Sequence, residues 1–268
     1  TLQLRKGEVH ALLGENGAGK STLMKCLFGI YSKDAGTIWF DGKEVNFKSS
    51  RDALDNGVAM VHQELNQALK RSVMDNIWLG RYPRIKLGGA KMPFVSDKAE
   101  YDMTMEVFKD LNFEKFGINI NPRTIMSTMP VSRRQMVEIA KAVSFNSKII
   151  VLDEPTSFLD IKGKIELLTI LKELAHTGQL AVILSLHELE LAEKIADTVV
   201  CVSPGGVSGV LTPEQAFQPE NIRTLYGLTE QQYTALFGTP EPEAEKAPAG
   251  KPQFEHYVRS GQKLLRCG

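Results

Sequence analysis

The stretch "GENGAGKS", residues 14–21, matches the pattern G-x-x-x-x-G-K-S/T at every specified position. It follows an apolar run, residues 8–13, that is typical of a buried strand, and it precedes a run typical of a helix. Glycines at these positions let backbone N–H groups turn toward a phosphate, and the N-terminus of the following helix adds positive potential. The stretch therefore predicts a phosphate-binding glycine loop and the α/β fold of a P-loop NTPase.

Each residue of this loop is a candidate ligand of ATP. Lys20 is expected to reach the β- and γ-phosphates, and the hydroxyl of Ser21 is expected to ligate Mg²⁺. A glycine-rich turn with a surface lysine is the alternative, which the complete motif and its strand-to-helix context disfavour. The predicted nucleotide-binding residues are Gly14, Glu15, Asn16, Gly17, Ala18, Gly19, Lys20, Ser21 and Thr22.

Two acids end a second apolar run, "KIIVLDE", residues 148–154. Asp153 is expected to hold Mg²⁺, directly or through water, and Glu154 to polarise the attacking water. Taken alone, an Asp-Glu pair after a strand is more often a solvated strand end. With a glycine loop upstream, we favour the functional interpretation.

Composition excludes several classes of protein. The 268 residues suffice for one large domain or two ordinary ones, and 32 basic residues balance 32 acidic ones, which gives no sign of a nucleic-acid partner. The cysteines Cys26, Cys201 and Cys267 form no metal or disulfide pattern, as expected in a reducing cytoplasm. No apolar run reaches about 18 residues, so we expect that the chain itself does not cross a bilayer.

Strand and helix patterns alternate along the chain. Helices are expected at about 160–175 and 188–196, and a longer helical stretch at 73–142 is interrupted by a loop at 81–94. This alternation predicts a mostly parallel sheet covered on both faces, with ligands at the carboxyl ends of its strands. The expected strands are residues 8–14, 36–42, 57–63, 148–154, 180–187 and 197–202.

With these motifs in place, residues 1–210 resemble the nucleotide-binding domain of ABC transporters. Gln63 in "MVHQELN" matches the Q-loop glutamine, which implies contact with Mg²⁺ or water and with the membrane subunits. Asp160, ending "SFLD", matches the D-loop, which communicates between paired domains, and is expected to contact the bound nucleotide. His187, ending "VILSLH", matches the switch histidine that contacts the γ-phosphate. The resemblance thus adds Gln63 and His187 to Glu154 as predicted catalytic residues, and makes Gln63 a metal ligand beside Ser21 and Asp153.

The resemblance also implies a domain organisation. Residues 1–72 and 143–210 are expected to form a RecA-like ATP-binding core whose first strand region is truncated. Residues 73–142 match the helical subdomain that carries the signature loop. We expect a C-terminal extension at 211–238, and a linker followed by the truncated start of a further domain at 239–268, where "TPEPEAEKAPAGKP" cannot build a core.

The stretch "MPVSRRQMVEIAKA", residues 129–142, has two interpretations. Ser132 followed three residues later by Gln135 is the pattern of a capping box, which spacing alone favours. By resemblance, the same segment is the signature loop, typically Leu-Ser-Gly-Gly-Gln, which clamps the γ-phosphate of ATP bound to the partner domain. Pro130 replaces the serine and so lacks both a hydroxyl and an amide hydrogen. Ser132 is still expected to donate to phosphate, and Arg133 to contribute charge.

The resemblance changes along the chain. Residues 1–157, including "RSVMDNIWLGRYP", resemble ATPases of galactose- and ribose-type sugar importers. Residues 158–238, including "LSLHELELAEKIADTVVCV", resemble those of iron-siderophore or cobalamin importers, and residues 253–268 resemble the start of a cobalt-precorrin C-methyltransferase. We therefore expect a chimera, formed by recombination, assembly or design and truncated at both ends.

This resemblance implies an importer subunit that hydrolyses ATP as a dimer with a second ABC ATPase domain. It would lie on the cytoplasmic face of the plasma (inner) membrane, held there by transmembrane permease subunits and served indirectly by a periplasmic or extracellular solute-binding protein. A monosaccharide is favoured over an iron chelate or cobalamin, because the sugar-like portion includes Gln63 and the helical subdomain. Two alternatives stay open: a module that binds Mg-ATP but hydrolyses it weakly or not at all, because of the altered signature and a missing adenine-stacking aromatic, and a non-functional fragment.

Overall fold

The computed structural model describes residues 2–87, 90–178, 180–238, 257–260 and 263–266. The chain divides into two units, residues 1–228 and residues 229–268. The second unit contains α10 (Glu230–Phe237) and the antiparallel hairpin of β11 (Tyr257–Ser260) and β12 (Lys263–Arg266). The linker and domain start predicted for residues 239–268 fall mostly outside the described residues.

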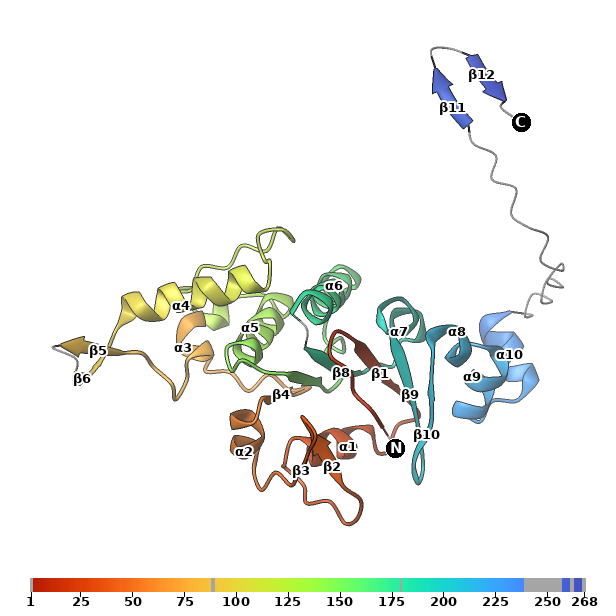
Figure 1. Cartoon of the computed structure of the whole chain (residues 1–268), viewed down its shortest axis with the longest axis horizontal. Coiled ribbons are helices and arrows are strands. Elements are labelled where there is room, and N and C mark those ends of the chain that lie inside the picture. Colours follow the sequence, from red (N-terminus) through yellow and green to blue (C-terminus); the bar gives the residue numbers. More distant parts are fainter. Residues whose placement is uncertain (1, 88–89, 179, 239–256, 261–262, 267–268) are drawn as a thin grey trace. The chain divides into compact units, whose positions relative to one another are not determined.

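A six-stranded sheet in the order β10-β9-β1-β8-β7-β4 forms the centre of the first unit (Figure 1). The strands from β9 to β4 are parallel, which confirms the predicted sheet, and β10 is antiparallel to β9. The sequence analysis missed β10, whose residues alternate between exposed and half-buried at the sheet edge. The six strands are β1 (Val9–Leu13), β4 (Val58–Val61), β7 (Ile149–Leu152), β8 (Ala181–Ser185), β9 (Thr198–Ser203) and β10 (Gly206–Leu211).

Helices cover both faces of this sheet. On β1, Leu12 packs into one hydrophobic cluster, while Ala11 and Leu13 pack into another, because successive side chains of a strand point to opposite faces. Figure 1 shows α5, α6 and α7 over the Leu13 face, and α1 and α2 beyond the other. The helices are α1 (Lys20–Leu27), α2 (Ser50–Asp55), α5 (Val131–Val143), α6 (Ile161–Gly178) and α7 (Leu189–Ile195).

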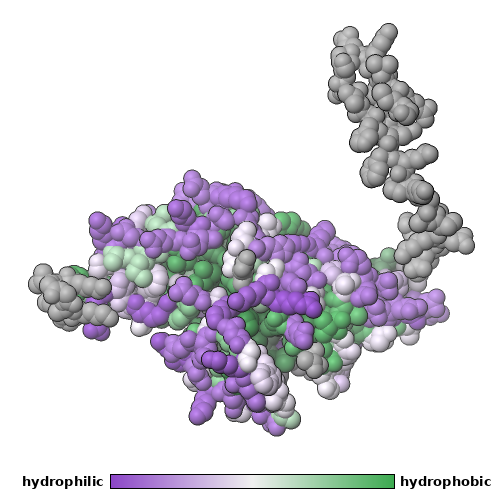
Figure 2. All heavy atoms as spheres, in the orientation of Figure 1, coloured by the Kyte–Doolittle hydropathy of each residue, from purple (hydrophilic) through white to green (hydrophobic). Residues whose placement is uncertain are grey.

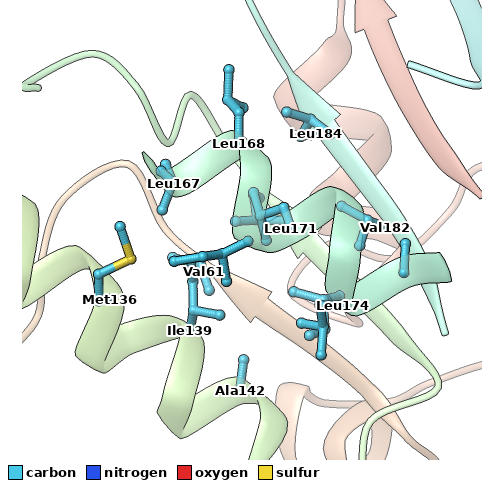
Figure 3. Close-up of a cluster of buried hydrophobic side chains, with 14 of the residues drawn as sticks. Val61, Met136, Ile139, Ala142, Leu167, Leu168, Leu171, Leu174, Val182 and Leu184 are labelled. Carbon is cyan, nitrogen blue, oxygen red and sulfur yellow. The ribbon is translucent and has the colours of Figure 1, made fainter. Parts of the chain in front are cut away.

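Figure 3 shows how the larger cluster joins helices to the sheet. Met136 and Ile139 on α5 point toward Leu171 on α6, with Val61 of β4 between them. The apolar residues of α5 recur at helical spacing and are fully buried at these positions. Burying each such side chain stabilises the fold by about 1.5–3 kcal/mol. This packing fixes the beginning of α5 relative to the strand ends.

The predicted helical subdomain contains α3 (Val73–Ile77), α4 (Asp97–Asp110), a short 3-10 turn (Met126–Thr128) and then α5. One prediction inside it is wrong. Residues 81–94, expected as a loop, contribute to an antiparallel hairpin of β5 (Arg84–Leu87) and β6 (Ala90–Val95). The sequence places a Gly-Gly pair between two short runs with β-branched and apolar residues, which is a hairpin signal that was overlooked.

Smaller elements complete the first unit. β2 (Ile38–Phe40) and β3 (Lys43–Val45) form a hairpin whose two loop residues, Asp41 and Gly42, both have positive φ, as a type I′ turn requires. α8 (Pro213–Ala216) and α9 (Pro219–Leu225) pack near β9. The predicted extension at 211–238 is therefore divided between the two units.

The visible surface of the first unit is mainly hydrophilic. Figure 2 shows hydrophilic side chains over most of the helices in view, with hydrophobic side chains exposed between them in the middle of the face. Among the helices within the described residues, none is long and apolar enough to span a membrane.

Candidate functional site

The glycine loop, residues 14–21, connects the carboxyl end of β1 to α1. A Cβ on Gly14 would lie 2.1 Å from the carbonyl oxygen of Val202 on β9, so no other residue fits without movement of the sheet. Gly17 and Gly19 have φ angles of 83° and 103°, which favour glycine. Gly19 is the N-cap of α1 and no side chain caps that helix, so its first N–H groups have no side-chain acceptor. This is the geometry of an anion site.

Lys20 lies across the inside of this loop. Its side chain is buried, and Nζ donates hydrogen bonds to the carbonyl oxygens of Gly14 at 2.8 Å and Glu15 at 3.0 Å. Burial lowers the pKa of Lys20, and the carboxylates of Glu154 and Asp153 oppose that shift. The ammonium group therefore ties the two ends of the loop together and adds positive charge beside its amides.

Ser21 and Asp153 meet although they are far apart in the sequence. The Ser21 hydroxyl donates to Asp153 Oδ1 at 2.9 Å, and the Ser185 hydroxyl donates to the same oxygen at 3.2 Å. The strand order explains the meeting, because β8 lies between β1 and β7 and all three end at the same edge of the sheet. Asp153 is 6% exposed, so its charge is held mostly away from bulk water.

Glu154 is the centre of the next group of side chains. Its Oε1 lies 2.5 Å from Nε2 of His187, and its Oε2 accepts hydrogen bonds from Nε2 of Gln63 at 2.9 Å and from the Ser157 hydroxyl at 3.2 Å. Its backbone has a positive φ of 47°, which is uncommon for a residue other than glycine. The structure thus brings together Gln63, Glu154 and His187, which the sequence analysis proposed as catalytic.

The donor set at Ser21 and Asp153 fits a hard divalent cation. The part of the chain that the structure describes contains no group of three or more His, Cys, Asp or Glu side chains that could hold a metal. A Mg-nucleotide site needs fewer, because phosphate oxygens and waters supply most of the ligands. One hydroxyl and one carboxylate beside the glycine loop meet this need. Gln63, predicted as a third ligand, donates instead to Glu154.

The signature segment differs from its local prediction. The predicted capping box of Ser132 and Gln135 is wrong: α5 begins at Val131, Pro130 is its N-cap, and no side chain caps it. Pro130 has an extended backbone conformation, with φ −63° and ψ 155°, and the helix starts directly after it. Ser132 is therefore the second helical residue, and Gln135 lies one turn inside the helix and is buried.

Two other residues expected to meet phosphate have partners within the chain. Arg133 donates to Glu166 Oε2 on α6 at 3.0 Å, so its charge is already paired. Asp160 Oδ1 accepts the backbone N–H of Gly163 at 2.8 Å, at the start of α6. A Cβ on Gly163 would lie 3.2 Å from Cβ of Ser132, so the signature segment and the start of α6 are in close contact. Within the described residues, no hydrogen bond joins Ser132 or Asp160 to the glycine loop.

Sequence reasoning missed a polar network that holds the turn after β7. The Thr156 hydroxyl donates to Glu188 Oε2 at 3.0 Å, and Lys164 Nζ pairs with Oε1 at 2.5 Å. Burial raises the pKa of Glu188, but the hydrogen bonds from Lys164 and Thr156 outweigh it and hold the pKa below its usual value. Sequence reasoning also missed Ser185. The only feature that could have indicated it is a single hydroxyl residue at the end of the apolar run 181–185.

The sequence model of the family described as ABC transporter matches residues 1–157. The chain belongs to the ABC transporter family. Its similarity to solved structures of that family is consistent with this. A nucleotide-free ATP-binding cassette from an ABC transporter has a TM-score of 0.68 at 18% identity, over 88% of this chain and 90% of that one. The structure of cbiO1 from Clostridium perfringens, described as part of the ABC transporter complex cbiONQ, has a TM-score of 0.67 at 24% identity, over 88% and 89%. At these identities the likeness concerns the fold.

Curated relatives within the ABC family are more similar in sequence. The galactose/methyl galactoside import ATP-binding protein MglA of Clostridium perfringens (strain 13 / Type A) is 54% identical over 205 residues, which are 76% of this chain and 38% of the relative. MglA of Escherichia coli (strain K12) is 50% identical over 204 residues, again 76% and 38%. The chain thus spans about 38% of the length of these relatives.

These comparisons also bear on the expected change of resemblance. An aligned length of 205 residues extends past residue 157, so the similarity to galactose importers continues into the segment predicted to resemble iron-siderophore or cobalamin importers. The predicted chimera remains a prediction. The resemblance of residues 253–268 to a cobalt-precorrin C-methyltransferase is not supported by these comparisons.

Proposed function

We propose that this chain is the ATP-binding subunit of an ABC importer and hydrolyses ATP as a dimer to power uptake of a monosaccharide. The observation that carries the proposal is the joint placement of Glu154 between Gln63 and His187, next to the Ser21–Asp153 pair. The names of the relatives, galactose/methyl galactoside import ATP-binding proteins, support a sugar as the cargo. The domain boundaries predicted from the sequence form part of this proposal.

Each residue has a separate role in this mechanism. The amides of the glycine loop and Lys20 bind the β- and γ-phosphates. Ser21 and Asp153 would hold Mg²⁺, which would neutralise charge on the phosphates. Glu154 accepts a proton from the attacking water. His187 orients Oε1 of the Glu154 carboxylate, and Gln63 orients Oε2. Glu154 is held from several sides, so little reorganisation is needed when the proton moves.

An apolar strip beside Asp160 supports a second ABC domain as partner. Phe158 is 65% exposed, Ile161 78% and Ile165 54%. Ile161 and Ile165 are four residues apart on α6 and so share one face of that helix. Large apolar side chains gathered in this way are typical of an interface rather than of a solvated surface. The uncapped start of α5, with Ser132 in its first turn, would reach the phosphates bound to that partner.

A groove next to the Q-loop residue supports docking of a permease subunit. A cavity of about 190 Å³ lies between α2, β4 and α5, lined among others by Phe28, Met60, His62, Glu138 and Phe145. Apolar side chains line part of this cavity, and the half-buried carboxylate of Glu138 lines another part. Oε1 of Glu138 is buried without a hydrogen-bond partner in the described structure. We assign this groove to a segment of the permease, which would hold the chain peripherally at the cytoplasmic membrane face. A solute-binding protein would act through the permease.

The altered signature favours a second candidate function, an ATP-binding module with weak hydrolysis. Pro130 offers neither hydroxyl nor N–H at the position where the family has serine. Arg133 is paired with Glu166 and does not replace that donor. This alternative shares the binding site with the importer subunit and differs in turnover.

Substitution of Glu154 by Gln tests the proposed chemistry. We expect the variant to bind a fluorescent ATP analogue as the unaltered chain does, while Mg-dependent phosphate release falls by about 10²–10⁴-fold, because the proton acceptor is lost. Glu193→Gln, an exposed position on α7, is the matched control and should leave both measurements unchanged. Equal turnover in the Glu154 variant and the unaltered chain would contradict the mechanism. Binding without turnover in the unaltered chain would favour the module.

Co-purification tests the partner and the cargo. The chain would be co-expressed with the permease of a galactose importer, and retention of the permease and uptake of labelled galactose would be measured. Glu138→Arg, which puts a cation into the groove, should release the permease, whereas Glu106→Arg at an exposed position on α4 should not. Retention with both variants would rule out this docking groove.

A further inference from the structure

One buried hydroxyl links the two neighbouring acids of the site. Ser185, the last residue of β8, is fully buried. Its Oγ donates to Asp153 Oδ1 at 3.2 Å and accepts the backbone N–H of Glu154 at 2.8 Å. The hydroxyl has one hydrogen to donate, and the carboxylate receives it. A single side chain on one strand thus contacts two consecutive residues that follow the neighbouring strand.

The bond to the Glu154 amide supports an uncommon backbone conformation. Glu154 has φ of 47°, in the left-handed region that residues with a Cβ rarely adopt. Such conformations persist where surrounding contacts determine them. The hydrogen bond to Ser185 is one such contact, because it fixes the backbone N–H of Glu154. The position of this backbone sets the direction in which the Glu154 side chain extends to His187.

The bond to Asp153 supports the orientation of the carboxylate. Oδ1 has two hydroxyl donors, Ser21 on the glycine loop and Ser185 on β8. Ser21 is also the proposed ligand of Mg²⁺, through a lone pair of its oxygen, while its hydrogen stays available to Oδ1. Ser185 belongs to β8, which lies between β1 and β7, so it holds the carboxylate from the sheet itself.

We propose that Ser185 is a positioning residue, which sets the Asp153 carboxylate for Mg²⁺ and the Glu154 peptide for water activation at the same time. This inference rests on the proposed function. Residues that orient a metal ligand typically change metal affinity or activity 10–100-fold when they are removed. The effect expected of Ser185 is therefore on the response to Mg²⁺ rather than on binding of the phosphates alone.

The test is Ser185→Ala in the full chain, and Thr104→Val is its matched control. Thr104 is also fully buried, and its hydroxyl also makes one donated and one accepted bond, to the Glu100 carbonyl at 2.7 Å and from Trp78 Nε1 at 2.9 Å. It lies on α4, in the helical subdomain. Each variant would be titrated with a fluorescent ATP analogue in EDTA and then with MgCl₂, and its stability measured by urea unfolding.

We expect Ser185→Ala to raise, by about 10–100-fold, the Mg²⁺ concentration that gives half of the Mg²⁺-dependent change in analogue fluorescence. Its affinity for the analogue in EDTA should change less than about twofold. Thr104→Val should shift stability but leave the Mg²⁺ response unchanged. Ser185→Cys, which keeps a weak donor of similar size, is a second variant in case the alanine protein does not fold, and should shift the response in the same direction.

Two results would overturn the proposal: an unchanged Mg²⁺ response in the Ser185 variants, or an equal shift in Thr104→Val. The experiment also separates this inference from the proposed function. If the unaltered chain binds the analogue and responds to Mg²⁺ but the Ser185 variants match it, only the positioning role fails. If the unaltered chain shows no Mg²⁺-dependent binding, the proposed function fails and the positioning role with it.

Discussion

Glu100 provides a quantitative test of how burial affects this fold. The residue lies on α4 and is 2% exposed, and its Oε1 has no hydrogen-bond partner within the described structure. Burial, with Asp75 and Asp97 nearby, raises the pKa of Glu100 from 4.5 to about 7. The folded protein therefore binds a proton at a pH where the unfolded chain has released it, and stability falls as the pH rises from about 4.5 to about 7.

The magnitude follows from the shift. Each pKa unit corresponds to about 1.4 kcal/mol, so ionising Glu100 in the folded state costs on the order of 3 kcal/mol above pH 7. Glu100→Gln keeps the shape and removes the charge, so we expect the variant to gain up to about that amount relative to the wild type at pH 8 and little at pH 4.5.

Urea unfolding followed by circular dichroism at several pH values between 4.5 and 8 measures this difference. Glu106→Gln, at an exposed position on the same helix, is the control and should give a difference that does not vary with pH. If the free-energy difference between Glu100→Gln and the wild type is the same at both ends of this range, the carboxyl group does not titrate as its burial implies, and the argument is refuted.

Three further substitutions test other parts of the structure. Gly14→Ala should abolish binding of a fluorescent ATP analogue and lower the melting temperature, since its Cβ would lie 2.1 Å from the Val202 carbonyl oxygen; unchanged binding would contradict the loop geometry. Burial lowers the pKa of His10 from 6.5, so the folded state should lose stability as the pH falls below about 6.5. In His10→Phe the melting temperature should therefore fall less between pH 7.5 and 5.5 than in the wild type. Parallel curves of melting temperature against pH for the two proteins would argue against this. Pro130→Ser should raise ATP turnover of the dimer, by as much as about 100-fold if it restores a phosphate donor, and an unaltered rate would argue that this segment does not meet ATP.

Much of the fold was predictable because its signals are local. A strand-to-helix turn with glycines at Gly14 and Gly19 has few alternatives, and the apolar run ending at Asp153 is typical of a strand buried on both faces. The alternation of such runs with helical periodicity predicted the parallel sheet that the structure contains. Where two local signals competed, the prediction was wrong: the Ser132–Gln135 spacing suggested a cap at Ser132, but Pro130 is the N-cap and the helix begins at Val131.

The candidate site was only partly predictable. Glu154 was predicted from the acid pair after an apolar run, but Gln63 and His187 were identified only by their likeness to a family, since nothing in their spacing along the chain indicates that they touch Glu154. Their hydrogen bonds exist because β4, β7 and β8 end side by side. Ser185 had no local motif at all, and its role depends on β8 lying next to the strand that carries the two acids.

The sequence by itself determined the buried parallel strands, the long helices and the place where a phosphate is expected, because periodicity and glycine conformation act over a few residues. It did not reveal β10 at the sheet edge or the β5–β6 hairpin. The tertiary structure alone decided that a hydroxyl on β8 contacts both Asp153 and Glu154, and that Arg133 is paired with Glu166. These contacts depend on the order of strands and the packing of α5 on α6, which arise from burial of apolar surface over the whole core and leave no short-range pattern in the chain.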